Sequence, residues 1–217
     1  MNKTTQKVVS TIGVMLGIAG FNHGFFETLQ GWKPTEGLII RAIGQGQFSW
    51  IQGSEEAFTL IPNFLITGLA AMLVSTAIIV WSLRYLDRPR GASVFLGLFI
   101  LLFLVGGGIG QVVFFLPTWG AATRINRPLS WWNKILGVRL RRGLAHFWRY
   151  TLPAAVVFFL IALVIAIIWQ LPGITDPEVI LQIDWSFLLA GWVLMLISFG
   201  SAFAADLEAR RPAGDPQ

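Results

Sequence analysis

Residues 93–122 read SVFLGLFILLFLVGGGIGQVVFFLPTWGAA, an apolar run of 30 residues without a single charged side chain. A transmembrane helix needs about 20 such residues, so the run is long enough to cross a bilayer. The three glycines at 106–108 and Pro117 are poor residues for the interior of a continuous helix. The run therefore predicts a membrane-embedded segment that either spans the bilayer or folds back at the glycines as a re-entrant hairpin.

Four further apolar runs, near 7–29, 59–84, 152–171 and 184–205, are each long enough to span. The whole chain of 217 residues is 55% hydrophobic and 12% charged, with a mean hydropathy of +0.68. A soluble domain of this size is far less apolar. We predict an all-α fold class, namely a polytopic helical membrane bundle of five hydrophobic segments in one domain, 1–209, followed by a disordered tail, 210–217.

The composition excludes several kinds of chemistry. There is no cysteine, which rules out disulfides, thiolate metal sites and thiol catalysis, and two histidines cannot build a multi-histidine metal site. The glycines at 106–110 lack the Lys-Ser/Thr of a phosphate-binding loop. The net charge of +5 comes from basic residues in the loops between apolar runs, so the expected partner is anionic lipid rather than nucleic acid. No cofactor and no metal are expected.

The distribution of Lys and Arg separates two topologies, because cytoplasmic loops carry the excess of these residues. Five straight spans with the N-terminus outside place 11 of the 16 basic residues in the cytoplasm. An inside N-terminus with the third segment folded back places 14 there and leaves only Lys33 and Arg41 outside. Both topologies put 124–149 and the C-terminus in the cytoplasm, and they differ over the N-terminus and the first loop. A cysteine at Ser49 would distinguish them by labelling with an impermeant maleimide.

Four glycines of the first segment, Gly13, Gly17, Gly20 and Gly24, recur at spacings of four, three and four. At about 100° per residue they share one face of a helix. Small residues arranged in this way let a second helix approach closely within lipid. The face predicts tight helix packing, either inside the monomer or along a homodimer seam.

Beside the glycines, His23, Glu27 and Gln30 form a polar stripe at positions i, i+4 and i+7. Ionisable groups in a span usually pair with one another or line a cavity. Three interpretations remain open: a satisfied His–Glu pair, a ligand-binding or proton-handling site with His23 and Glu27 as candidate acid and base, and an axial histidine ligand to a haem or chlorophyll. Asn63 in the second segment and Gln111 in the third are candidates to complete a polar cavity with the stripe.

The connection 124–149 carries seven basic residues and no acid, interleaved with aromatic and aliphatic side chains. This pattern predicts an interfacial amphipathic helix seated on anionic headgroups. The alternatives are a simple positive-inside signal and a docking surface for an acidic protein. The expected membrane-surface residues are Arg124, Arg127, Trp131, Trp132, Lys134, Arg139, Arg141, Arg142 and Arg149. The loop 31–58, with its apolar pieces 38–40 and 48–51, is expected to lie on the bilayer or to cap the bundle as a lid.

Four motifs carry a resemblance to a known family: HGFFETLQG from His23, IPN from Ile61, GGG from Gly106 and AATRINRPLSWW from Ala121. Together they resemble an uncharacterised family of small bacterial polytopic membrane proteins, over most of the chain. The resemblance implies a shared fold and the bacterial cytoplasmic (inner) membrane, and it supplies no activity.

The His-x3-Glu pair is also similar to that of the sterol-isomerase-like five-helix membrane fold, in which such residues handle protons on a buried substrate. That family uses further acidic and tryptophan residues on later spans, and here segments two to four offer no acid and only Trp192 remains as a candidate. The leading hypothesis is a non-catalytic membrane protein that binds lipid or a partner protein within the bilayer. The second is a membrane-embedded enzyme acting on a lipid-soluble substrate, and the third is a small transporter.

Overall fold

The computed structural model describes residues 1–43, 55–168 and 170–210, which are mostly helical. Four helices are long and apolar enough to cross a membrane: α1 (Lys3–Leu29), α2 (Phe64–Arg84), α7 (Trp148–Ile168) and α8 (Pro177–Glu208). They correspond to the first, second, fourth and fifth of the apolar runs. The fold is therefore compatible with a multi-pass membrane protein.

The third apolar run is interrupted. It forms α3 (Gly91–Leu104), the strand β3 (Val105–Gly108) and α4 (Gln111–Ala122). The rings of Phe99 in α3 and Phe115 in α4 stack with their centroids 4.0 Å apart. After α4, the Asn126 side chain donates a 2.7 Å hydrogen bond to the carbonyl of Asp87, which precedes α3. The chain thus returns to the end of the molecule from which α3 started, and the five predicted apolar runs form four long helices and one interrupted segment.

A small antiparallel sheet corrects the all-α prediction. β1 (Ile39–Ile43), β2 (Glu55–Thr59) and β3 lie in that order, with Ala57 of β2 opposite both Ile40 and Gly108. The sequence does not indicate β3, because three glycines have no strand propensity of their own and the partner strand is about fifty residues away. β1 and most of β2 belong to the loop 31–58, which was expected to lie on the bilayer or to form a lid. The apolar piece 48–51 of that loop lies outside the described residues.

The basic connection is two short helices rather than one, α5 (Ser130–Ile135) and α6 (Val138–Leu144), separated by Gly137. Both pack against the C-terminal part of α8, where the Trp132 and Phe203 rings lie 4.8 Å apart. The predicted tail, 210–217, begins with Arg210, whose side chain donates a 2.6 Å hydrogen bond to that of Asn2, and residues 211–217 lie outside the described residues.

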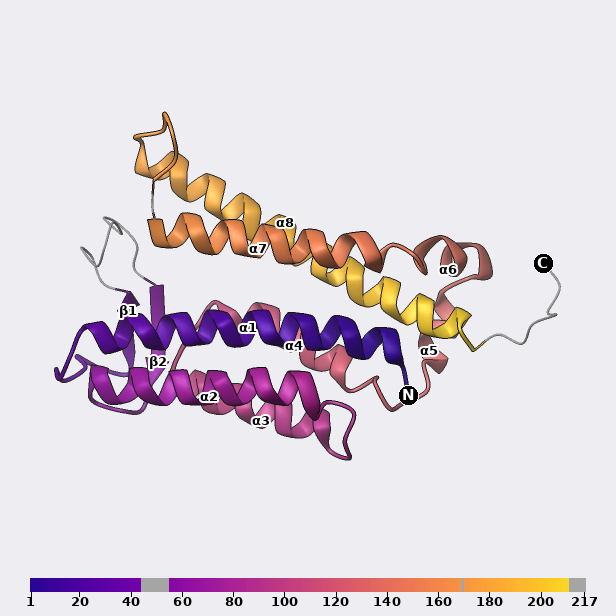
Figure 1. Cartoon of the computed structure of the whole chain (residues 1–217), viewed down its shortest axis with the longest axis horizontal. Coiled ribbons are helices and arrows are strands. Elements are labelled where there is room, and N and C mark those ends of the chain that lie inside the picture. The colour runs from indigo at the N-terminus through magenta and orange to yellow at the C-terminus, as the bar shows by residue number, and fades with distance from the viewer. Residues whose placement is uncertain (44–54, 169, 211–217) are drawn as a thin grey trace.

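α1 is the central helix, with α2 on one side and the α7–α8 pair on the other (Figure 1). Its four glycines lie against α2, and Gly13 and Gly20 also face Phe95 and Leu102 of α3. A Cβ on Gly24 would come within 2.6 Å of the Gly68 carbonyl oxygen. The glycine face is therefore covered within one chain. The largest apolar core lies between these helices and includes Ile12, Phe95 and Met195.

The start of α1 is capped from α8. The buried carboxylate of Asp206 accepts hydrogen bonds from the backbone N–H groups of Thr4 (2.9 Å) and Thr5 (2.8 Å), and from the Thr5 hydroxyl (2.7 Å). A carboxylate at this position satisfies free N–H groups and complements the positive end of the helix dipole. Next to it, the Asn2 N–H donates to the Ile125 carbonyl, which fixes the end of α4 in the same place.

The two ends of the molecule differ in charge. The basic end holds the N-terminus, the turn 85–90, the segment 123–147 between α4 and α7, and the end of α8 (Figure 1). The acidic end holds the sheet and the turn between α7 and α8 (Figure 1). Of the fifteen Lys and Arg residues in the described ranges, thirteen lie in the half that contains the basic end. Seven of the ten described acidic residues lie in the other half.

Candidate functional site

The polar stripe at the end of α1 meets β3 in the half of the molecule that contains the acidic end. Glu27 is completely buried, and a Cβ on Gly106 would overlap its carboxyl group. Gly106 has φ +106°, a backbone conformation that favours glycine. The glycine is thus required twice, once by its backbone conformation and once by the closeness of Glu27.

Neither carboxyl oxygen of Glu27 has a hydrogen-bond partner in the described part of the chain. The satisfied His23–Glu27 pair that the helical spacing allows is therefore not formed. A buried polar group without a partner costs free energy, and an ionised one within a bilayer costs more, on the order of 3 kcal/mol. Such a group is compatible with a bound proton or with a ligand that donates hydrogen bonds to it.

His23 lies one turn before Glu27 and is also buried. A Cβ on Gly108 would overlap its imidazole, so the ring packs directly on the backbone of β3. Its Nε2 is 4.0 Å from the Oε2 of Glu55 in β2, and its Nδ1 has no partner among the described residues. The Glu55 side chain is 46% exposed, whereas that of His23 is 11% exposed. Glu55 therefore connects the buried imidazole to the surface.

Two further polar side chains, partly buried Gln111 and buried Asp184, belong to this region. Both amide atoms of Gln111, at the start of α4, lack a partner in the described ranges, and so does Oδ1 of Asp184 in α8. Asp184 follows Ile183, which packs against an apolar cluster that contains Phe26 of α1 and Ile43 of β1. We refer to His23, Glu27, Glu55, Gln111 and Asp184 as the polar cluster.

The remaining predicted residues of the cavity have structural partners. Gln30 donates hydrogen bonds to the carbonyls of Arg41 (2.8 Å) and Ala42 (3.0 Å), which ties the end of α1 to β1. Asn63 is the N-cap of α2 and accepts from the Ile66 N–H. Glu55 and Asp184 belong to the cluster but were not predicted from sequence to be part of the site. The sequence does mark Asp184 as a candidate, because it is an acidic residue at the first position of an apolar run.

No group of three or more His, Cys, Asp or Glu side chains in the described ranges is arranged to hold a metal ion. Within the same ranges, no Lys or Arg forms an ion pair with a carboxyl group of the polar cluster. The available chemistry is thus an acceptor-rich site with one imidazole and one amide. Such a site suits a proton or a small group that carries hydrogen-bond donors.

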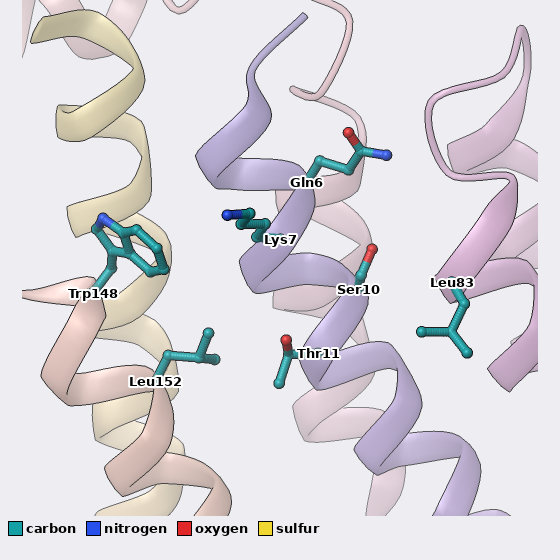
Figure 2. Close-up of a pocket in the computed structure, with 7 residues that line it drawn as sticks. All are labelled: Gln6, Lys7, Ser10, Thr11, Leu83, Trp148 and Leu152. Atoms are coloured by element: carbon teal, nitrogen blue, oxygen red, sulfur yellow. The ribbon is translucent and has the colours of Figure 1, made fainter. Parts of the chain in front are cut away.

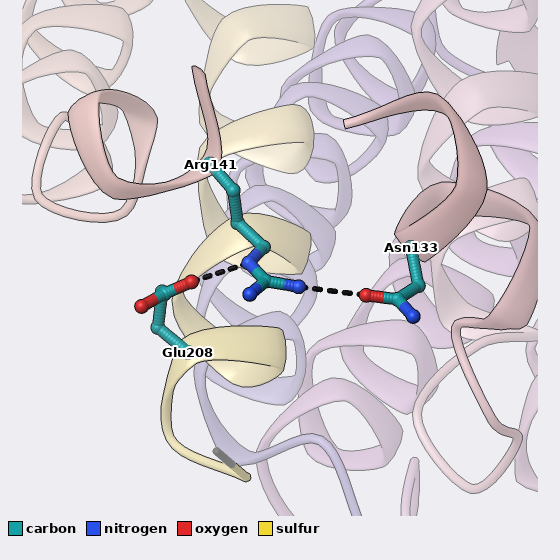
Figure 3. Close-up of polar contacts among 3 residues, drawn as sticks. All are labelled: Asn133, Arg141 and Glu208. Carbon is teal, nitrogen blue, oxygen red and sulfur yellow. Dashed lines mark hydrogen bonds and ion pairs between the residues drawn. The ribbon is translucent and has the colours of Figure 1, made fainter. Parts of the chain in front are cut away.

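The membrane-surface residues of the basic connection divide into two groups. Arg141 is buried and donates to Glu208 of α8 and, at 2.7 Å, to the side chain of Asn133 in α5 (Figure 3). Its charge is therefore used within the protein, where it holds both short helices on α8. The other basic residues are exposed, namely Arg124, Arg127, Lys134, Arg139, Arg142 and Arg149. Exposed apolar residues, including Trp131 and Phe147, lie among them.

Comparison of the chain with protein-family models, with curated proteins and with solved structures gives no match in any of the three.

Proposed function

We propose that this protein is a non-catalytic, multi-pass membrane protein that binds a lipid or lipid-soluble compound within the bilayer through its polar cluster. The observation that carries the proposal is the buried, unpartnered carboxyl group of Glu27. Buried polar groups are normally satisfied, and an ionisable one inside a span marks a functional site by default. The ligand class follows from the chemistry: a hydroxyl or ammonium group that donates to Glu27, with an apolar body compatible with lipid.

The orientation is part of the proposal. With the basic end in the cytoplasm, the exposed arginines of the basic connection meet anionic headgroups of the inner leaflet, each contributing about 1 kcal/mol. α3, β3 and α4 then form a re-entrant hairpin that enters from the cytoplasm. Unpaired backbone is tolerated at membrane depth only where protein surrounds it, and the pairing of β3 with β2 supports this arrangement. We place the protein in a bacterial inner membrane, as the family resemblance implies.

Native mass spectrometry of the full chain in mild detergent tests ligand binding. Wild type, Glu27→Gln and Glu36→Gln are compared, because Glu36 is an exposed carboxylate toward the same end and serves as a matched control. We expect wild type and Glu36→Gln to retain a small molecule that Glu27→Gln loses. Equal retention by all three, with unchanged thermal unfolding, would contradict the proposal.

A membrane-embedded enzyme is the second candidate, because His23 lies one helical turn before buried Glu27 and its imidazole is 4.0 Å from the half-exposed Glu55 carboxylate. Such an arrangement lets a proton exchange between the site and the surface, as acid–base catalysis requires. The retained molecule distinguishes the two functions. An enzyme should yield a chemically converted molecule from wild type and the unconverted one from His23→Gln, whereas a binding protein yields the same molecule from both.

A further inference from the structure

A second polar site lies in the half of the molecule that contains the basic end, far along α1 from the polar cluster. It is a cleft of about 500 Å³ over the first turns of α1, between the end of α2 and the start of α7 (Figure 2). Four polar side chains of α1 line it: Gln6, Lys7, Ser10 and Thr11. Its apolar walls are Leu83 of α2 and Leu152 of α7, with Trp148 beside them.

The side chains in this cleft hold unused hydrogen-bond donors. Serine and threonine hydroxyls within helices commonly donate to a carbonyl of the preceding turn, as Thr76, Thr118 and Ser198 do here at 2.7–2.8 Å. Ser10 and Thr11 make no such bond within the described part of the chain. The Lys7 ammonium, which extends toward Trp148 (Figure 2), forms no ion pair there either.

The surroundings of the cleft favour an anion. Arg84 follows Leu83 directly and Arg149 follows Trp148, so an exposed basic residue is next in sequence to a lining residue on each side of the cleft. The carboxylate of Asp206, which lies near the cleft, already accepts hydrogen bonds from the N–H groups at the start of α1. A tryptophan and a lysine close to the end of a span are typical of the headgroup level of a bilayer.

We propose that this cleft binds the headgroup of an anionic phospholipid. The phosphodiester accepts from the Lys7 ammonium and the hydroxyls of Ser10 and Thr11, while an acyl chain lies against Leu83 or Leu152. The site is distinct in place and in chemistry from the polar cluster, since it supplies donors where the cluster supplies acceptors. The lipid site and the proposed function share one assumption, that the basic end of the molecule faces the cytoplasm. Ligand binding by the polar cluster can therefore be disproved while the lipid site stands, and the reverse also holds.

The test measures lipid retention by the full chain after reconstitution in bilayers of equal parts phosphatidylglycerol and phosphatidylcholine, followed by native mass spectrometry. We compare Lys7→Met with Lys3→Met, which removes the same charge from an exposed position one turn earlier on α1. The second pair is Thr11→Val and Thr76→Val, because the Thr76 hydroxyl is already bonded to its own helix.

Wild type, Lys3→Met and Thr76→Val are expected to retain phosphatidylglycerol in preference to phosphatidylcholine. Loss of a charge-assisted hydrogen bond should lower that preference about tenfold in Lys7→Met, and Thr11→Val should lower it several-fold. Equal losses in Lys7→Met and Lys3→Met would overturn the site in favour of a diffuse surface attraction. Release of the lipid by millimolar inorganic phosphate would overturn it in favour of a free-phosphate site.

Discussion

At the scale of single residues, Glu27 and Gly106 depend on one another. The carboxyl group occupies the space that any side chain on residue 106 would need, and the positive φ of Gly106 disfavours every other residue type. The sequence alone identifies Glu27, His23 and the glycines as unusual, because ionisable groups and consecutive glycines are rare in spans. It does not show that they touch, since a contact between residues 27 and 106 depends on how the helices pack.

We expect Gly106→Ala to lower the free energy of unfolding by about 2–4 kcal/mol, because it adds backbone strain and overpacking at one position. Gly97→Ala is the control, since a Cβ there meets nothing within 4 Å and helix propensity favours alanine. Thermal unfolding in detergent measures both variants. Adding Glu27→Ala to Gly106→Ala should recover the packing part of the loss, and strict additivity of the two changes would show that the residues do not interact.

At the scale of elements, β2 and α2 supply the hydrogen bonds that β3 lacks as an interruption between two helices. β2 pairs with β3 through Ala57 opposite Gly108 and Thr59 opposite Val105, and the Thr67 hydroxyl of α2 donates to the Val105 carbonyl at 2.8 Å. Where α3 ends, the Leu104 carbonyl accepts from the Leu60 N–H, directly after β2, at 2.9 Å. Backbone that leaves a helix inside a membrane must be satisfied in such a way. The interruption of the third apolar run is therefore stabilised by residues of the second apolar run and of the loop before that run.

Thr67→Val should lower the free energy of unfolding by about 1–3 kcal/mol, because it leaves the buried Thr59 hydroxyl and the Val105 carbonyl each without this partner. Thr76→Val is the control, because Thr76 is exposed and its hydroxyl is bonded only to its own helix. It should lower the free energy of unfolding by less than about 0.5 kcal/mol. Chemical unfolding monitored by tryptophan fluorescence compares the two. Equal effects would mean that the hydroxyl of Thr67 does not hold β3.

The helices could be predicted from sequence and the sheet could not, for a physical reason. Each helix satisfies its own backbone, so its apolar run is a local signal, and the predicted 59–84 and 184–205 overlap α2 and α8 closely. The strand hydrogen bonds of β3 are made with residues distant in sequence, and its glycines show no alternation of apolar and polar side chains that would indicate a strand. The same reasoning explains Asp184 and Glu55, which join the polar cluster because α8 and β2 bring them there.

At the scale of the whole molecule, the separation of charge predicts how the chain lies in a membrane. Because the segment 91–122 folds back, the turn 85–90 and the connection 123–147 lie at the same end as the N-terminus. A straight third span would instead place 85–90 opposite the connection. The fold-back thus brings nearly all basic residues to one side, which agrees with the positive-inside rule.

Single cysteines test this orientation without background, since the chain contains none. In intact cells, an impermeant maleimide should label Glu36→Cys, whereas Arg88→Cys should be labelled only after lysis. Both positions are exposed, so a lack of reaction reports sidedness rather than burial. Labelling of Arg88→Cys together with protection of Glu36→Cys would indicate the straight five-span topology.

The cap that Asp206 places on the start of α1 also sets an order of events during synthesis. The amides of Thr4 and Thr5 are separated from their carboxylate acceptor by 202 and 201 residues. At roughly 5–20 residues per second, the ribosome needs about 10–40 s to reach Asp206 after it has made Thr5. During that interval the first turn of α1 must rely on water or lipid headgroups, so α1 acquires its cap only after most of α8 has been made.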